Sequence, residues 1–421
     1  MIRNIHLKID WLLYFIVLLP TFYIAGGENR FDQIQFFQMA AMLLVAVMHV
    51  NKWIGAFLGW CIFQFLFFKN MPNYSVVLQN LFLGAVIYQF IVKCCSVKSY
   101  KKYIWTFVGL LSLNVAWCFL QMFQIDPIFQ MYDYKYQQTF SEYAGFFALP
   151  AFLGNFAAPL LTLSFLLSYY LTPLFLTALF FSKSTFSILA AFMAALFFFW
   201  FRKRIAFWII LLVGGVTFLT YAIKYDLPTG QFERRLNIWG VVLKLAFKNQ
   251  FLGYGIGTYG NQIIGETTPS HNIVFTNDPN YLKRFLQDDA AALNKTEVVE
   301  FIKTMPLSFD LFQLREKMRA HGMDFEMWKN AHNEFLEIFY ETGLIGLFIV
   351  CGFIFDFFKR FWRYARDNPL CISLMASFIA ILIVSFGHFP FHLARLAGPF
   401  IVLIAMLDLA LSNARKTKEE S

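Results

Sequence analysis

Apolar segments recur along almost the whole of this chain, and they limit its fold more than any other feature. The chain has 421 residues, of which 59% are hydrophobic and only 14% are charged. A helix needs about 20 apolar residues to cross a bilayer, and it satisfies its own backbone polar groups there. Twelve apolar segments can be counted, namely 11–26, 34–50, 53–68, 75–92, 104–123, 156–171, 173–182, 186–201, 205–223, 335–356, 370–386 and 397–411. The sequence therefore predicts an all-α polytopic membrane protein with about twelve transmembrane helices.

The first apolar segment has the charge pattern of a signal peptide, because Arg3 and Lys8 precede it. No small-residue cleavage site follows it, and many further segments do, which favours an uncleaved first helix. The segment 173–182 is short for a full span, and Ser182-Lys183-Ser184-Thr185 separates it from the next segment.

The placement of Lys and Arg predicts the orientation in the membrane. With both termini in the cytoplasm, the inside segments hold 17 of the 35 basic residues and the short outside loops hold five. Short cytoplasmic loops are enriched in Lys and Arg, whereas long loops translocate regardless of their charge. The formal net charge of +9 reflects mostly this bias, so it does not indicate a nucleic-acid partner.

Three regions follow from this topology. Residues 1–223 are predicted to form an N-terminal transmembrane bundle of about nine spans, and residues 335–421 a C-terminal bundle of about three. Between them, residues 224–334 form a large, mostly helical periplasmic loop, with an amphipathic helix over 232–249 and helical pieces near 295–304 and 308–321. All six cysteines lie in or beside apolar segments, so neither a disulfide framework nor a zinc site is predicted in the loop.

The glycine-rich stretch Gly255-Ile-Gly257-Thr-Tyr-Gly260 matches the dinucleotide-binding pattern. In that motif a strand precedes the glycines and a helix begins on them. Neither is predicted here, and the stretch lies on the outside. A flexible turn that returns the chain to the membrane is the favoured interpretation.

A histidine and three acids mark the junction between the loop and the tenth apolar segment. His332 and Asn333 precede Glu334, Glu337 and Glu341, whose spacing places the three carboxylates on one helix face. Acids are costly in a bilayer unless they line protein or a wet cavity, and a histidine exchanges protons near neutral pH. The junction is predicted to be the rim of an active site. An ordinary interfacial histidine, or acids that form an ion route, are the alternatives.

Cations near the membrane surface are candidates for an anion site. Arg234 and Arg235 begin the amphipathic helix, Lys183 lies in the break between two apolar segments, and Arg395 lies in the last outside loop with His388 and His392. Such residues are often anchors for lipid headgroups. Alternatively, a guanidinium grips phosphate oxygens in pairs, and the free N–H groups of a helix start also attract anions.

Taken in order, three elements resemble the O-antigen ligase and polymerase superfamily of bacterial envelope glycosyltransferases. They are Ser182-Lys183, then Arg235-Leu-Asn-Ile-Trp239 followed by Asn249-Gln-Phe-Leu-Gly253-Tyr-Gly255-Ile-Gly257, then His332-Asn333-Glu334-Phe335-Leu336 with Glu341-Thr-Gly343-Leu-Ile-Gly346. The resemblance covers roughly residues 145–355 and is greatest to the O-antigen ligases. One departure is Lys183, where the family commonly has arginine, which grips phosphate with a fork that lysine lacks.

The resemblance implies a donor glycan on undecaprenyl pyrophosphate at the periplasmic face of a Gram-negative inner membrane, and lipid A–core as acceptor. Arg235 and Lys183 would bind the pyrophosphate, with Arg234 as a neighbouring candidate. His332 would be the general base for an inverting transfer without metal or other cofactor, and the supporting residues would be Asn333, Glu334, Glu337 and Arg395.

Within this class, a polymerase or a protein O-oligosaccharyltransferase would use the same donor with another acceptor. A transporter that uses the acids for ions is the alternative from another class. It predicts charged or broken segments at mid-membrane depth.

Overall fold

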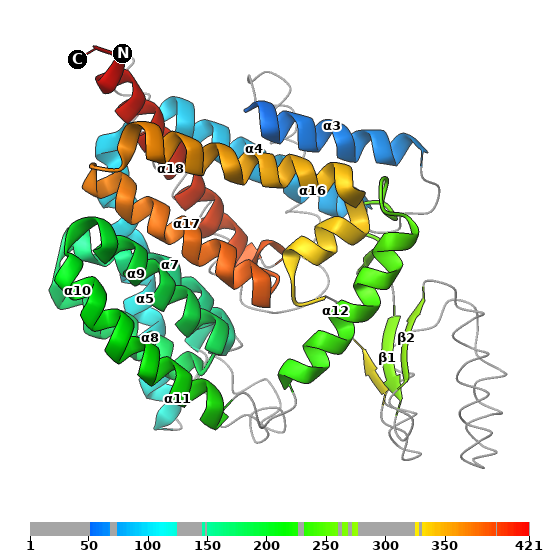
Figure 1. Ribbon diagram of the computed structural model, residues 1–421, viewed down its shortest axis with the longest axis horizontal. Coiled ribbons are helices and arrows are strands. Elements are labelled where there is room, and N and C mark those ends of the chain that lie inside the picture. Colours follow the sequence, from blue (N-terminus) through cyan, green and yellow to red (C-terminus); the bar gives the residue numbers. More distant parts are fainter. Residues whose placement is uncertain are drawn as a thin grey trace.

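The computed structural model describes residues 51–67, 74–123, 145–147, 150–225, 231–259, 263–267, 272–276, 325–327, 331–392 and 394–420. Helices make up most of these ranges (Figure 1). The α-helices are α3 (Lys52–Phe67), α4 (Tyr74–Cys94), α5 (Tyr100–Met122), α7 (Pro150–Leu167), α8 (Thr172–Ser182), α9 (Thr185–Arg202), α10 (Arg204–Ile209), α11 (Gly215–Tyr225), α12 (Gln231–Lys248), α16 (Glu334–Arg360), α17 (Pro369–Gly387) and α18 (Ala394–Glu420). Short 3-10 turns cover Val97–Ser99, Gly145–Phe147, Tyr169–Leu171 and Pro390–His392, and π-helical turns cover Ile210–Gly214 and Phe361–Ala365.

Within the part of the chain that the structure describes, six helical segments are long and apolar enough to cross a membrane, which makes the chain a helical membrane protein. They are Tyr100–Met122, Pro150–Leu167, Thr185–Arg202, Glu334–Ala365, Pro369–Gly387 and Leu396–Glu420. Each of the ten predicted segments from 53–68 onward coincides with a helix or, at 205–223, with α10 and α11 joined by a π-helical turn. The segments 11–26 and 34–50 lie outside the described residues, so the total of twelve stays a prediction.

Helix α17 lies at the centre of the bundle, with α18 on one side and α7 and α9 on the other (Figure 1). Small residues line this helix, including Ala376, Ala380 and Ser377, all fully buried. Small side chains let membrane helices approach closely, and hydroxyls can bond across the contact. The hydroxyl of Thr162 on α7 donates to the carbonyl of Ser373 on α17 at 3.1 Å.

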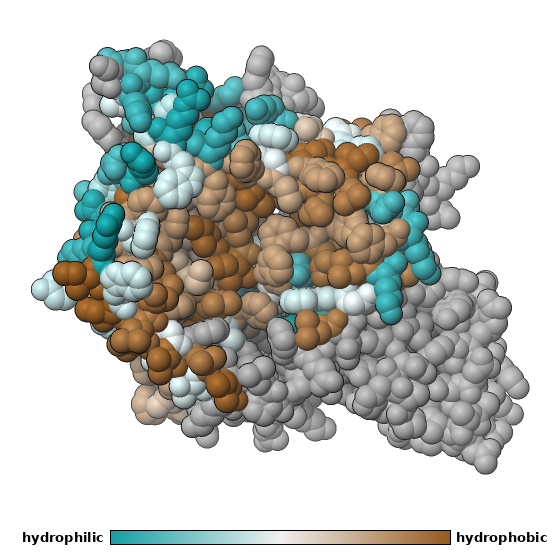
Figure 2. All heavy atoms as spheres, viewed as in Figure 1, coloured by the Kyte–Doolittle hydropathy of each residue, from teal (hydrophilic) through white to brown (hydrophobic). Residues whose placement is uncertain are grey.

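One end of the bundle is hydrophilic. Hydrophilic residues gather around the end of α18, and apolar side chains cover the flank below it (Figure 2). At the hydrophilic end, Lys418 donates to the carbonyl of Arg363 at 3.0 Å, and Arg415 lies over the Tyr364 ring at 5.9 Å. His332 and His388 lie at the opposite ends of α16 and α17 from this basic cluster.

Helix α16 breaks at Gly343, which has φ +68° inside the helix. The turn after α12 docks into the break: Tyr254 N–H donates to the carbonyl of Tyr340 at 3.0 Å, and Leu344 N–H donates to the carbonyl of Gln250 at 2.7 Å. A Cβ on Gly343 would overlap the carbonyl of Phe251. Backbone groups freed by a break at membrane depth need partners within the protein. The glycine-rich stretch is thus a turn fitted to α16, and among the described residues no strand precedes it.

Part of the predicted loop forms a sheet, which the sequence analysis did not predict. Strands β1 (Ile263–Thr267), β2 (Asn272–Thr276) and β3 (Phe325–Met327) pair antiparallel in the order β2-β1-β3. In the register, Gly265 lies opposite Val274 on one side and opposite Met327 on the other. The signal was two short segments with adjacent β-branched residues, Ile263-Ile-Gly-Glu-Thr267 and Asn272-Ile-Val-Phe-Thr276, separated by a four-residue link that contains Pro and Ser. The predicted helical pieces near 295–304 and 308–321 lie outside the described residues.

Helix α12 shares a small core with the first half of α16. Ile238, Val242 and Ala246 of α12 pack in one cluster with Phe339 and Tyr340 of α16. The loop helix is therefore fastened to the membrane helix that follows the histidine. The division into regions 1–223, 224–334 and 335–421 stays a prediction.

Candidate functional site

His332 stands at the start of α16 in a left-handed backbone conformation, with φ +52°. The next residue, Asn333, caps the helix: its side-chain oxygen accepts from the N–H groups of Phe335 at 3.0 Å and Leu336 at 3.1 Å. Asparagine is among the best helix N-caps for this reason. The imidazole of His332 contacts Phe389 with ring centres 4.9 Å apart. The predicted rim residue is thus held by a capped helix on one side and the loop between α17 and α18 on the other.

The three acids of the predicted stripe are buried, and each fastens a different piece of backbone. Glu334 accepts from the N–H of Phe391 at 2.7 Å and Glu341 from that of Tyr259 at 3.0 Å, while Glu337 accepts from the N–H of Ala331. A buried carboxylate is stabilised by such charge-assisted hydrogen bonds. The acid stripe therefore connects α16 to the turn after α12, to the segment before His332 and to the loop between α17 and α18.

Arg235 reaches the same end of the bundle from α12. Its guanidinium lies over the ring of Phe186, near the start of α9, at 5.3 Å. Four residues along the same face, Trp239 donates from its indole to the carbonyl of Ala331 at 2.9 Å. The spacing Arg235-x-x-x-Trp239 therefore lets one helix face present the guanidinium and also hold the residue before His332.

The approach of Phe186 depends on a glycine. A Cβ on Gly387, at the end of α17, would overlap the ring of Phe186. The same ring meets the imidazole of His388 edge to face, with centres 6.0 Å apart. Phe186 is thus a platform between the Arg235 guanidinium and the Gly387–His388 backbone.

His388 is a site residue that the sequence analysis named without assigning it a role. It is buried, its Nε2 lies 3.3 Å from the hydroxyl of Ser184, and its ring centre lies 6.5 Å from that of His332. The available signal was its position in the same predicted outside loop as Arg395. Its spacing from His332 could not reveal the contact, because 55 residues and two helices separate them.

Both histidines are held in the neutral form. Burial and then the positive charge of Arg235 lower the pKa of His332 to about 4. The same two causes, with His332 as a third, bring the pKa of His388 well below its ordinary value. A neutral imidazole has a free lone pair, so at pH 7 either ring can accept a proton.

The remaining predicted residues are placed less fully. Lys183 is exposed and ends α8 in a left-handed conformation, φ +46°, directly before Ser184. Arg234 lies on α12 and Arg395 on α18, but the positions of their side chains are outside what the structure describes. Across the described ranges, no three His, Cys, Asp or Glu side chains are grouped so that they could hold a metal ion.

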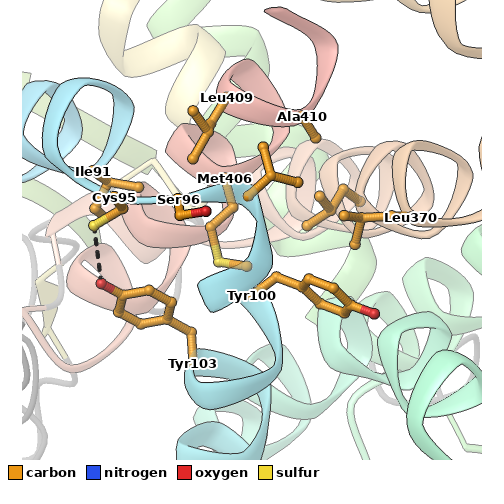
Figure 3. Close-up of a pocket in the computed structure, with 11 residues that line it drawn as sticks. Ile91, Cys95, Ser96, Tyr100, Tyr103, Leu370, Met406, Leu409 and Ala410 are labelled. Atoms are coloured by element: carbon orange, nitrogen blue, oxygen red, sulfur yellow. Dashed lines mark hydrogen bonds between the residues drawn. The ribbon is translucent and has the colours of Figure 1, made fainter. Parts of the chain in front are cut away.

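A small pocket lies away from this site, between α4, α5, α17 and α18 (Figure 3). Leu370 and Leu374, at the start of α17, line it, whereas His388 follows the other end of that helix. Cys95 and Tyr103 also line it, and the Sγ and hydroxyl oxygen of these residues are 3.2 Å apart. Its lining is mostly apolar and holds no histidine or cation.

The fold and this cluster define a class: a helical membrane protein with two neutral histidines and an arginine gathered at one end of its bundle. No family model matches the chain, and no curated protein matches it.

Proposed function

We propose that this chain is a glycosyltransferase of the O-antigen ligase type, which moves a glycan from undecaprenyl pyrophosphate to lipid A–core. One observation carries the proposal. Arg235 and His332 are 97 positions apart in the sequence, yet α12 brings them to the same cluster, where the charge of Arg235 lowers the pKa of His332. A cation for a diphosphate and a base for a hydroxyl are the two groups that such a transfer needs.

In the proposed reaction, neutral His332 takes the proton of an acceptor hydroxyl as the oxygen attacks the first carbon of the donor sugar. The bond from that carbon to the diphosphate breaks, and its electron pair leaves on the phosphate oxygen. Arg235, steadied on Phe186 at 5.3 Å, offers two parallel N–H groups to that oxygen and its neighbours. Lys183 adds a second cation next to the start of α9. Fixed positive groups stabilise the charge that builds on the leaving diphosphate.

The proposed location is the periplasmic face of the inner membrane of a Gram-negative bacterium. It rests on the count of basic residues, which predicts that the loop after α11 and the start of α16 face outward. The lipid-linked donor would approach through the membrane, and exposed apolar side chains on α12 and the turn after it, including Leu236, Phe247 and Phe251, suit contact with lipid.

The test is a gel of lipopolysaccharide from a strain that lacks the gene, complemented with the wild type or with His332→Asn. Asparagine tolerates the left-handed conformation of His332, so this variant removes the imidazole and spares the backbone. Bare core with carrier-linked polymer in both the deletion and the variant supports the ligase. Core with a single repeat would indicate a polymerase instead. An unchanged ladder in the deletion strain would exclude both and leave protein glycosylation to be examined.

A transporter is the second candidate, because two features of the membrane helices favour it. Helix α16 is broken at Gly343, and Asp408 on α18 is buried and paired with Arg360 and Tyr88. However, the break is filled by the turn after α12, by the indole of Trp60 and by the amide of Gln64. Proton or cation flux into vesicles that contain the purified protein would support the transporter. If the flux is no greater than into vesicles without protein, the transporter is excluded.

A further inference from the structure

A set of buried polar side chains surrounds the start of α9. The hydroxyl of Ser184 lies 3.3 Å from Nε2 of His388 and 2.9 Å from the hydroxyl of Ser187. The Ser187 hydroxyl donates to Oδ1 of Asn155 at 2.7 Å. These four residues, which we call the polar joint, are all buried, and they come from α7, the start of α9 and the loop after α17. The joint therefore fastens the start of α9 to two other elements of the bundle.

Stability alone does not account for the polar joint. Helix capping explains Ser184, whose hydroxyl accepts from the N–H of Ser187 at 3.4 Å. It does not explain Asn155, whose Nδ2 is buried with no hydrogen-bond partner among the residues that the structure describes. A buried amide with one of its two polar atoms unsatisfied lowers the free energy of unfolding. The contribution of the joint is therefore sought in what it holds in place.

The joint holds a short segment that serves both cations of the site. Lys183 lies directly before Ser184, in a left-handed conformation with φ +46°. This conformation is disfavoured for a residue other than glycine and persists where its neighbours impose it. The N–H of Ser184 donates to the hydroxyl of Ser182 at 3.3 Å, which closes the turn around Lys183. Phe186, in the first turn of α9, lies under the Arg235 guanidinium at 5.3 Å.

The elements that carry the joint also pack closely on this segment. A Cβ on Gly154 of α7 would overlap the side chains of Ser182 and Ser187. The ring of Phe186 meets the imidazole of His388 edge to face, with centres 6.0 Å apart. Because the same segment carries Lys183 and Phe186, loss of a joint hydrogen bond should let both of them shift.

We propose that the polar joint positions Lys183 and, through Phe186, Arg235 for the diphosphate of a lipid-linked donor. The inference rests on the proposed function, because it takes these two cations as the diphosphate site. The four joint residues are positioning residues: they act through the segment that carries the cations and do not themselves touch the diphosphate. Cations that are already held in place bind a diphosphate more tightly, because less ordering of side chains opposes binding.

Ser187→Ala tests the joint directly, because it removes one hydroxyl and alanine is a strong helix former. The full-length protein in lipid discs is titrated with farnesyl diphosphate, and its transfer kinetics are measured with a lipid-linked glycan donor. We expect Ser187→Ala to raise both the Kd for farnesyl diphosphate and the KM for the donor by about 3- to 10-fold, with a smaller change in kcat. Wild-type values of Kd and KM would show that the joint is only structural.

Thr162→Val is the matched control. Like Ser187, Thr162 is buried and bonds to another helix, since its hydroxyl donates to the carbonyl of Ser373 on α17 at 3.1 Å. Thr162→Val should lower the thermal midpoint to a similar extent as Ser187→Ala and leave Kd and KM at their wild-type values. If both variants raise Kd and KM equally, the effect is a general loss of packing and the positioning role is refuted.

Two further comparisons test the route through the cations. Ser184→Thr keeps the hydroxyl and the helix cap, so it should retain the Kd of the wild type, whereas Ser184→Ala should raise it. In an Arg235→Ala background, Ser187→Ala should raise Kd by a smaller factor than in the wild type, because one of the two cations that the joint positions is gone. An equal factor in both backgrounds would refute the positioning of Arg235.

The two readouts separate this inference from the proposed function. If the wild type binds farnesyl diphosphate but transfers no glycan, the glycosyl transfer is wrong, and a raised Kd in Ser187→Ala still supports the joint. If the wild type transfers glycan and Ser187→Ala has the same Kd and KM, the joint is wrong while the glycosyl transfer stands. If the wild type neither binds the diphosphate nor transfers glycan, both are wrong.

Discussion

The carboxylate of Glu337 accepts a hydrogen bond from the backbone N–H of Ala331, the residue directly before His332. On the other side of the same peptide segment, the carbonyl of Ala331 accepts from the indole of Trp239. Glu337 of α16 and Trp239 of α12 therefore hold the residue before His332 in place, which supports the left-handed backbone conformation of His332. A non-glycine residue with positive φ costs about 1–2 kcal/mol and persists only where the surroundings impose it.

This relationship predicts that Glu337 supports His332 through the backbone. Glu337→Ala leaves the buried N–H of Ala331 without its carboxylate, which costs about 1–3 kcal/mol of unfolding free energy. Glu337→Gln retains an acceptor oxygen and should lose less stability. Both variants should lower glycan transfer, and the loss should follow the loss in stability. The measurements are the thermal midpoint in detergent and the transfer rate.

Glu419→Gln is the matched control for this pair. Glu419 pairs with Arg415 at 2.8 Å on an exposed stretch of α18, and exposed ion pairs contribute little. We expect no measurable change in the thermal midpoint. If Glu337→Ala is as stable and as active as Glu419→Gln, the support that Glu337 gives to His332 is refuted.

The break in α16 makes a second prediction, on glycines. Gly343 and Gly253 have φ of +68° and +70°, and a Cβ on either would overlap the backbone of the facing segment. Gly343→Ala and Gly253→Ala should each abolish the fit between α16 and the turn after α12, and so lower the thermal midpoint and the activity together. Gly240→Ala, with no atom within 4 Å of its added Cβ, should be neutral or slightly stabilising, since alanine favours a helix by about 0.5–1 kcal/mol. A Gly343→Ala variant as stable as Gly240→Ala would contradict the docked break.

Much of the helical architecture could be predicted from the sequence, because each apolar segment is local information. The break at Ser182-Lys183-Ser184-Thr185 correctly separates α8 from α9. The sheet could not be predicted in the same way, because its third strand, Phe325–Met327, is three residues long and pairs with a strand nearly 60 positions earlier. Such pairing depends on tertiary contacts more than on propensity.

Those residues of the candidate site whose chemical type alone suggests a role could be predicted from the sequence. His332 and Arg235 were named, and they come together. The acids were noticed for their spacing, but their role in fastening three backbone segments depends on Tyr259 and Phe391, which only the fold brings near. The partnership of His388 with Ser184 is of the same kind, because it joins two helix ends 204 positions apart.

Phe186 gives a third prediction, on the Arg235 guanidinium. A cation over an aromatic ring gains about 0.5–2 kcal/mol, so Phe186→Leu should raise the KM for the lipid-linked donor by roughly 2- to 30-fold with a smaller effect on kcat. Arg235→Lys should reduce donor use less than Arg235→Ala, because lysine keeps the charge and loses the fork. Steady-state kinetics with varied donor measures both. Equal and mild effects of the two Arg235 substitutions would show that Arg235 is a surface anchor.

The lowered pKa of His332 makes the last prediction, on pH. The unfolded chain has a histidine pKa near 6.5 and the folded chain one of about 4, so between these values the unfolded state binds a proton that the folded state does not. The unfolding free energy contributed by this group is therefore complete above pH 6.5 and falls as the pH is lowered towards 4, by at most roughly 3 kcal/mol. His332→Asn should remove this dependence and flatten the stability profile over that window by about one proton. The dependence that remains should come from His388, whose pKa is lowered as well.

The same lowered pKa predicts how activity depends on pH. The kcat/KM of the wild type should stay level from pH 8 down to about 5, because His332 remains neutral over that range. A kcat/KM that falls with a midpoint near 6.5, or a His332→Asn profile as steep as that of the wild type, would show that His332 is not held neutral by burial and Arg235.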